Sequence, residues 1–198
     1  MLLVSSVSVK GSMMITHSGD TDPTTEGWWA YATVGGVNWD YTVIPDAGPV
    51  TTDGIAAWRI LDTATQGSNE LPYRYDASLA GSNWRYSAYV KAYERNSAAN
   101  SRLNASLDVN VQTSYYFGTP IGYRHRLTLY DNGQGGTEVY VFGNTPFVTT
   151  IDGNGFHWVE MIHQSGVGTA LFINGELVTP SLPTSSYYYT ATKAQVTV

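Results

Sequence analysis

The 198-residue sequence contains no cysteine. Disulfide bonds, thiolate nucleophiles and cysteine-based zinc sites are therefore excluded. Packing must hold the fold together, and the 42% of residues that are hydrophobic are enough for a sizeable core. Because only 13% of the residues are charged, the composition is not that of an intrinsically disordered chain, and we expect a folded protein.

Basic residues are also scarce. Ten lysines and arginines stand against sixteen acidic residues, which gives a formal net charge of −6, and the basic residues form no cluster along the chain. A protein with this charge repels phosphate backbones, so we expect no nucleic-acid partner.

Long apolar runs are missing as well. The apolar stretch Leu2-Leu3-Val4 near the start is too short for a signal peptide, and we expect no membrane span. We expect either that a leader has been removed or that the chain is part of a larger multidomain protein, with residues 1–17 as a partial or loosely ordered N-terminal segment. The abundance of Ser, Thr, Asn, Gly and Tyr is typical of secreted or cell-surface bacterial proteins that handle glycans.

No stretch keeps a 3.6-residue apolar period, whereas strand-like runs separated by turn residues recur along the chain. Residues 157–162 form one such run, and the Asn174-Gly175 pair suits a type I′ hairpin turn. We therefore expect one all-β domain over residues 1–198, built as a two-sheet antiparallel sandwich. In the candidate strand at residues 83–94, the predicted core face consists of Trp84, Tyr86, Ala88, Val90 and Ala92.

The clearest alternation lies at residues 103–112, where apolar and polar side chains take turns. The polar positions of this strand are Asn104, Asp108, Asn110 and Gln112, and those of a predicted neighbouring strand are Arg124, Arg126, Thr128 and Tyr130. If the two polar faces coincide, they form a groove that can bind sugar hydroxyls. A solvated convex surface fits the same pattern equally well, because alternation alone does not assign a strand to a sheet.

Two further sets of residues are candidates for a site. Tyr115 and Tyr116, in a predicted loop after the polar strand, offer flat surfaces on which a sugar ring can stack, although packing explains them too. Asp20 and Asp22, in a turn-like segment, are candidate oxygen ligands of a structural calcium ion. No EF-hand spacing is present, and aspartate favours turns on its own account.

Short motifs spread over residues 18–178 carry a resemblance to a known superfamily. They are Gly19-Asp20-Thr21-Asp22 with Glu26-Gly27-Trp28, Asp53-Gly54 with Ala57-Trp58, residues 84–91, and residues 156–178. Together they resemble the concanavalin A-like lectin/glucanase superfamily, and within it the lectin-like domain of bacterial sialidases. The resemblance implies a jelly-roll sandwich that binds sugar on a concave face or its rim, in some members with calcium. It also implies a glycan ligand, with sialic acid as one option.

Catalytic motifs are absent from the sequence. Glycoside hydrolases of this fold carry Glu-x-Asp-x-x-Glu, which does not occur here, and neither Gly-x-Ser-x-Gly nor His-Glu-x-x-His is present. The prediction is therefore a non-catalytic carbohydrate-binding module or lectin-like domain. The alternatives are a small secreted glycoside hydrolase or polysaccharide lyase on the same scaffold, and a purely structural or adhesive domain.

Overall fold

The structure is a computed structural model, and strands make up most of the part that it describes. The described residues are 17, 19–30, 32–34, 38–40, 48–59, 73–77, 83–92, 105–116, 119–188 and 194–197. The one helix among them is the short 3-10 helix η1 (Pro23–Glu26). No helix in these ranges is long and apolar enough to cross a bilayer. The predicted all-β class is confirmed.

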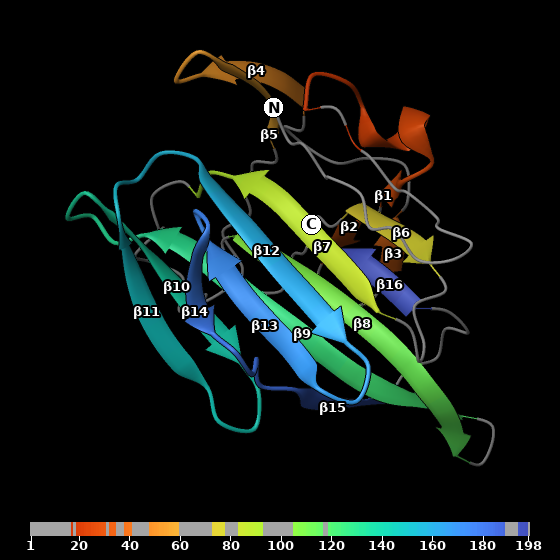
Figure 1. The fold of residues 1–198 in the computed structure, drawn as a ribbon. Helices are drawn as coiled ribbons and strands as arrows, with labels where there is room; N and C mark the ends of the chain where they lie inside the picture. The colour runs from red at the N-terminus through yellow and green to blue at the C-terminus, as the bar shows by residue number, and fades with distance from the viewer. Residues whose placement is uncertain are drawn as a thin grey trace.

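The larger of the two main sheets contains eight antiparallel strands (Figure 1). In spatial order they are β1 (Trp29–Ala30), β6 (Tyr73–Ala77), β16 (Ala194–Thr197), β8 (Ala105–Tyr116), β9 (Thr119–Asp131), β10 (Gly136–Phe142) and β11 (Phe147–Asp152), with β15 (Ser185–Tyr188) paired to β9. Strands β8 to β11 follow one another in the chain and in space. They form a meander that makes up one half of this sheet.

The smaller main sheet lies face to face with the larger one, in front of it in Figure 1. Its order is β14 (Glu176–Thr179), β13 (Gly168–Ile173), β12 (His157–Gln164) and β7 (Trp84–Val90). Two separate hairpins precede it in the chain, β2 (Ala32–Val34) with β3 (Asn38–Asp40) and β4 (Gly48–Thr52) with β5 (Ile55–Arg59). The β13–β14 hairpin turns at Asn174 and Gly175, whose φ angles of 52° and 85° confirm the predicted left-handed turn.

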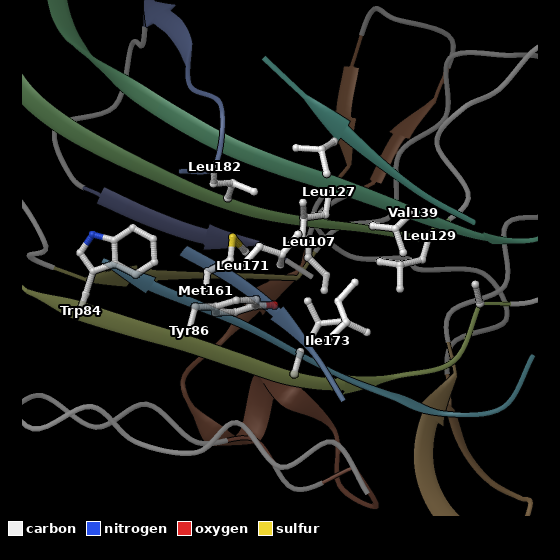
Figure 2. Close-up of a cluster of buried hydrophobic side chains, with 14 of the residues drawn as sticks. Trp84, Tyr86, Leu107, Leu127, Leu129, Val139, Met161, Leu171, Ile173 and Leu182 are labelled. Carbon is white, nitrogen blue, oxygen red and sulfur yellow. The ribbon is translucent and has the colours of Figure 1, made fainter. Parts of the chain in front are cut away.

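One hydrophobic core joins the two main sheets, which confirms the predicted sandwich. Figure 2 shows the large-sheet side chains of this core beside those of the small sheet. The large sheet contributes Leu107, Leu127, Leu129, Val139 and Val141, and the small sheet contributes Trp84, Tyr86, Ala88, Val159, Met161, Leu171 and Ile173. The core face predicted for β7 is thus buried, apart from Val90, which is partly exposed. Burial of alternate apolar side chains from both layers drives this packing.

The long β8–β9 hairpin corrects one sequence-based prediction. Tyr115 and Tyr116 do not lie in a loop, because β8 continues to Tyr116 and pairs these residues with Pro120 and Thr119. The aromatic side chains favour the extended conformation, so the strand persists beyond its regular alternating part. The residues predicted as a loosely ordered N-terminal segment, apart from His17, lie outside the described residues, as does Asn104.

A connector between β14 and β15 passes from the small sheet to the large one and contacts both. The Leu182 amide donates a hydrogen bond to the Thr169 carbonyl of β13 at 2.6 Å, and the Leu182 side chain is buried in the core. The next residue, Pro183, packs against Gly143, which follows β10. We call residues 180–184 the crossing segment.

Gly143 is expected to be sensitive to any side chain. A Cβ atom built at this position overlaps the Pro183 side chain and lies 3.1 Å from the Pro183 carbonyl carbon. Gly143→Ala should therefore lower the free energy of unfolding by about 1–3 kcal/mol, as overpacking does. Urea denaturation measures the effect. Gly155→Ala is the matched control, because a Cβ there has nothing within 4 Å, and equal stabilities of the two variants would contradict the expectation.

Candidate functional site

The two polar strand segments singled out from the sequence are neighbours in the large sheet. Strand β8 pairs with β9 so that Asp108 is opposite Arg126 and Asn110 is opposite Arg124. Residues directly opposite each other in an antiparallel pair share one face of the sheet. The predicted coincidence of the two polar faces is therefore present in the backbone register. This face points away from the core, which takes the alternate positions Leu107 and Leu127.

Strand β10 adds aromatic residues that the sequence analysis did not include. Phe142 is the register partner of Arg126, and Tyr140 is the partner of Thr128. The Arg126 guanidinium carbon lies 5.8 Å from the centre of the Phe142 ring, and the rings of Phe142 and Tyr140 meet edge to face at 4.4 Å. The signal that could have revealed them is their alternation with the buried Val139 and Val141.

Together these residues form the outer polar face. It is defined by Asp108, Asn110, Arg124, Arg126, Tyr130, Glu138, Tyr140 and Phe142. The two arginines and the three aromatic side chains are each half-buried, and the Tyr130 hydroxyl donates a hydrogen bond to Glu138. Thr128, between Arg126 and Tyr130 on the strand, is completely buried. The face thus combines cationic donors, acidic acceptors and aromatic surface.

A bulge in β8 decides where the remaining predicted residues lie. Gln112 pairs with Gly122, but the register shifts between Gln112 and Ser114. Because an extra residue reverses the alternation, Tyr115 becomes the partner of Pro120 and falls on the same face as Arg124. Tyr116 falls on the opposite face. The backbone therefore extends the outer polar face to one tyrosine of the pair.

Asp22 has a local structural role. Its Oδ1 accepts hydrogen bonds from the backbone N and the hydroxyl of Thr24, both at 2.8 Å, and so caps η1. Among the described residues, no three His, Asp or Glu side chains are grouped so that they could hold a metal ion. A calcium ion at Asp20 and Asp22 would have to take most of its ligands from backbone carbonyls and hydroxyls. The calcium site stays a prediction.

His157 is a core histidine whose two ring nitrogens both have hydrogen-bond partners. It is buried, its Nε2 donates to the Gly153 carbonyl at 3.1 Å, and its Nδ1 accepts from the Asn174 amide at 3.1 Å. Burial lowers the pKa of His157, and the hydrogen bond to Gly153 opposes this in part. The Asn174 side chain also accepts from the Trp158 backbone N at 2.9 Å, so this network fixes the β13–β14 turn against β12.

A second histidine network, the His125 cluster, was not visible in the sequence. It consists of His125 on β9, His163 on β12, Thr169 on β13 and the Pro183 carbonyl. His125 Nδ1 lies 3.1 Å from the Pro183 carbonyl and must donate to it, so the neutral ring accepts from the Thr169 hydroxyl at Nε2, at 2.8 Å. The same hydroxyl accepts from His163 Nδ1 at 2.9 Å.

Burial governs the chemistry of the His125 cluster. It lowers the pKa of His125 from 6.5 to about 4, while the hydrogen bond to Pro183 opposes this shift. Burial also lowers the pKa of His163, whose ring stacks on Trp84 at 5.3 Å. Thr169 and His125 are only 3% and 1% exposed, so the hydroxyl and its histidine cannot reach a substrate. The cluster joins the two sheets and is not a nucleophile with its base.

Three strand carboxylates, Asp108, Glu138 and Glu160, do not form a hydrolase pair with one another. Asp108 belongs to the register row of Arg126, whereas Glu138 belongs to that of Tyr130, four residues further along β9. Four residues of strand span about 13 Å, and the catalytic carboxylates of glycoside hydrolases are separated by about 5–10 Å. Glu160 lies on the other sheet, bonded to Arg85.

Comparisons with protein-family models and with curated proteins found no match to this chain. The kind of ligand that this protein can bind is therefore inferred from the chemistry of the outer polar face and from the sandwich that supports it.

Proposed function

We propose that this protein is a non-catalytic carbohydrate-binding module, a lectin-like domain that binds a glycan on the outer polar face. The observation that carries the proposal is the register of β8, β9 and β10. It brings Arg124 and Arg126 next to Asp108 and Asn110, with Phe142 on the same face.

The chemistry of the outer polar face suits a saccharide. Sugar hydroxyls both donate and accept hydrogen bonds, so a site needs donors such as arginine beside acceptors such as aspartate and asparagine. Aromatic rings such as Tyr140 and Phe142 offer apolar surface to the C–H side of the sugar ring. Two arginines on one face also suit a carboxylate, which supports a ligand that contains an acidic sugar such as sialic acid.

The order of the strands supports the finer assignment of the fold. We propose a concanavalin A-like jelly roll, because the chain passes between the two sheets after β6, after β7, after β11 and after β14. We also propose that the protein is secreted or displayed on the cell surface as part of a larger multidomain protein. Its sugar-binding face would then hold that protein to a glycan.

Replacing Arg126 or Asp108 by alanine is expected to weaken glycan binding about tenfold while the fold stays intact, since each change removes one charge-assisted contact. A glycan array identifies the ligand, and titration calorimetry with the strongest hit measures the affinity. Arg59→Ala and Glu176→Ala are matched controls, because both residues are exposed and lie outside this face. Unchanged affinity in both the Arg126 and the Asp108 variants would show that the glycan does not bind on the outer polar face.

Two further measurements separate this proposal from its rivals. Incubation with a panel of polysaccharides should release no reducing ends and no unsaturated products, because a binding module retains its ligand unchanged. Repeating the array with a chelator tests the predicted calcium ion at Asp20 and Asp22. Product release would make the protein a hydrolase or a lyase, and a lack of retention on every glycan would make it a structural or adhesive domain.

A further inference from the structure

The outer face of the small sheet carries a group of three aromatic side chains. Tyr89 on β7 and Trp158 on β12 are register partners, with ring centres 6.2 Å apart. Phe156, just before β12, stacks on Tyr89 at 5.1 Å with 23° between the ring planes. These positions alternate with the buried His157 and Val159, so they point away from the core, and all three side chains are half-exposed.

A polar group adjoins these rings on the same face. Glu160 is two residues beyond Trp158 on β12, which corresponds to about 7 Å along the strand. Its Oε1 accepts hydrogen bonds from Arg85 Nε at 2.7 Å, from Arg85 Nη2, and from the Ser87 hydroxyl at 3.2 Å. The Glu160 side chain is 12% exposed, whereas that of Arg85 is 41% exposed.

We propose that this aromatic and polar group, the small-sheet platform, is a second glycan-binding site. One sugar ring stacks on Trp158 and Tyr89, and the hydroxyl groups of the next sugar unit bond to Arg85 and Glu160. The separation of about 7 Å between the aromatic row and the polar row corresponds to the reach from the centre of a sugar ring to the hydroxyls of the next unit. This proposal does not depend on the outer polar face, because it rests on different residues in the other sheet.

The charges of the platform select the kind of sugar. Arg85 and Glu160 form an ion pair, so the platform presents donors and acceptors with little net charge. An anionic sugar would have to compete with Glu160 for Arg85, whereas a neutral sugar hydroxyl can bond to both groups without breaking the pair. The ligand class that fits the platform is therefore a neutral oligosaccharide, in contrast to the acidic glycan proposed for the outer polar face.

The positions of the Arg85–Glu160 pair and the rings favour a sugar over a protein partner. The core of a protein–protein interface is depleted of charged residues, but here the largely buried Glu160 carboxylate is in the row next to the rings and is paired with the exposed Arg85. Exposed apolar side chains do occur on β14 and β12, as Leu177 and Ile162, which are 56% and 36% exposed. Association of two copies through these residues is the alternative that the experiment tests.

Titration calorimetry with neutral pentasaccharides built from glucose, xylose or mannose tests the platform. The wild-type protein should bind at least one of them, and Trp158→Ala should weaken that binding about tenfold or more, as expected for loss of a stacking ring. Tyr89→Ala should also weaken it. Glu160→Gln keeps the size of the side chain but removes its charge, and should weaken binding without the loss of an aromatic ring.

Three controls make the outcome decisive. Arg59→Ala, at an exposed residue outside both faces, should leave neutral pentasaccharide binding unchanged, whereas loss of this binding in Arg126→Ala would assign it to the outer polar face and overturn the platform. Leu177→Ala should also leave neutral pentasaccharide binding unchanged, and urea denaturation should show that Glu160→Gln is folded even if Trp158→Ala is not. The proposal is overturned if no pentasaccharide binds, if Glu160→Gln binds like the wild type, or if light scattering shows a dimer that Leu177→Ala dissociates.

Discussion

Replacing Thr169 by valine is expected to lower the free energy of unfolding by about 1–3 kcal/mol, which is the cost of leaving the buried Nε2 of His125 without a hydrogen-bond donor. The Thr169 hydroxyl donates to His125 Nε2 and accepts from His163 Nδ1. His125 cannot compensate by moving its proton, because its Nδ1 must donate to the Pro183 carbonyl. Valine has the shape of threonine, so the loss reports the hydrogen bonds and not a cavity.

The matched control is Thr169→Ser, which keeps the hydroxyl and loses one methyl group. It should cost about 1 kcal/mol, the value for one buried methylene. Urea denaturation at pH 7 measures both variants. If Thr169→Val is no less stable than Thr169→Ser, the hydrogen bonds of the His125 cluster do not contribute to stability.

Lowering the pH from 7 to 5 is expected to reduce the free energy of unfolding by about 2 kcal/mol through His125 alone. In the folded protein the pKa of His125 is about 4, against an ordinary value of 6.5. Between pH 4 and pH 6.5 the His125 side chain binds a proton in the unfolded chain but not in the folded protein. The contribution of neutral His125 to stability is therefore fully present above pH 6.5 and is lost as the pH decreases toward 4. His157 and His163, whose pKa values are also lowered by burial, add to the loss in the same direction.

Comparing how the free energy of unfolding depends on pH in the wild type and in a variant separates the contribution of His125 from the titration of the carboxylates. His125→Asn keeps a polar side chain but cannot take up a proton, so its stability should fall less between pH 7 and pH 5. Denaturation curves at half-unit intervals of pH give both profiles. His125 would have an ordinary pKa in the folded protein if the two profiles ran parallel.

Alternation along single strands could be predicted from the sequence, and it located both the core and the polar face. The inward positions Trp84, Tyr86 and Ala88 are buried as expected, and the outward positions of β8 and β9 share one face. A period of two is a property of a single strand, so it can be recognised in the sequence without knowledge of the rest of the fold. Much of the described core could therefore be predicted before any strand was placed in a sheet.

Features that depend on which strands meet could not be predicted in this way. The His125 cluster combines residues from three strands in two sheets, and each residue taken singly has no recognisable pattern. The addition of Phe142 to the outer polar face depends on the pairing of β9 with β10, and the placement of Tyr115 depends on a bulge. Register and bulges are decided by the packing of whole sheets, so they leave no local signal.

The crossing segment resists opening of the sandwich at the end where it lies. At the end of the sandwich that contains this segment, the Leu182 amide donates to β13 and the Pro183 carbonyl accepts a hydrogen bond from His125 of β9. The Thr184 carbonyl accepts a hydrogen bond from the Asn144 amide at 3.2 Å. These bonds attach an irregular stretch of chain to both layers, so the Leu182 amide, which donates to β13, should exchange with deuterium as slowly as the amides of the central strands. Separation of the layers at this end of the sandwich would require these bonds to break first.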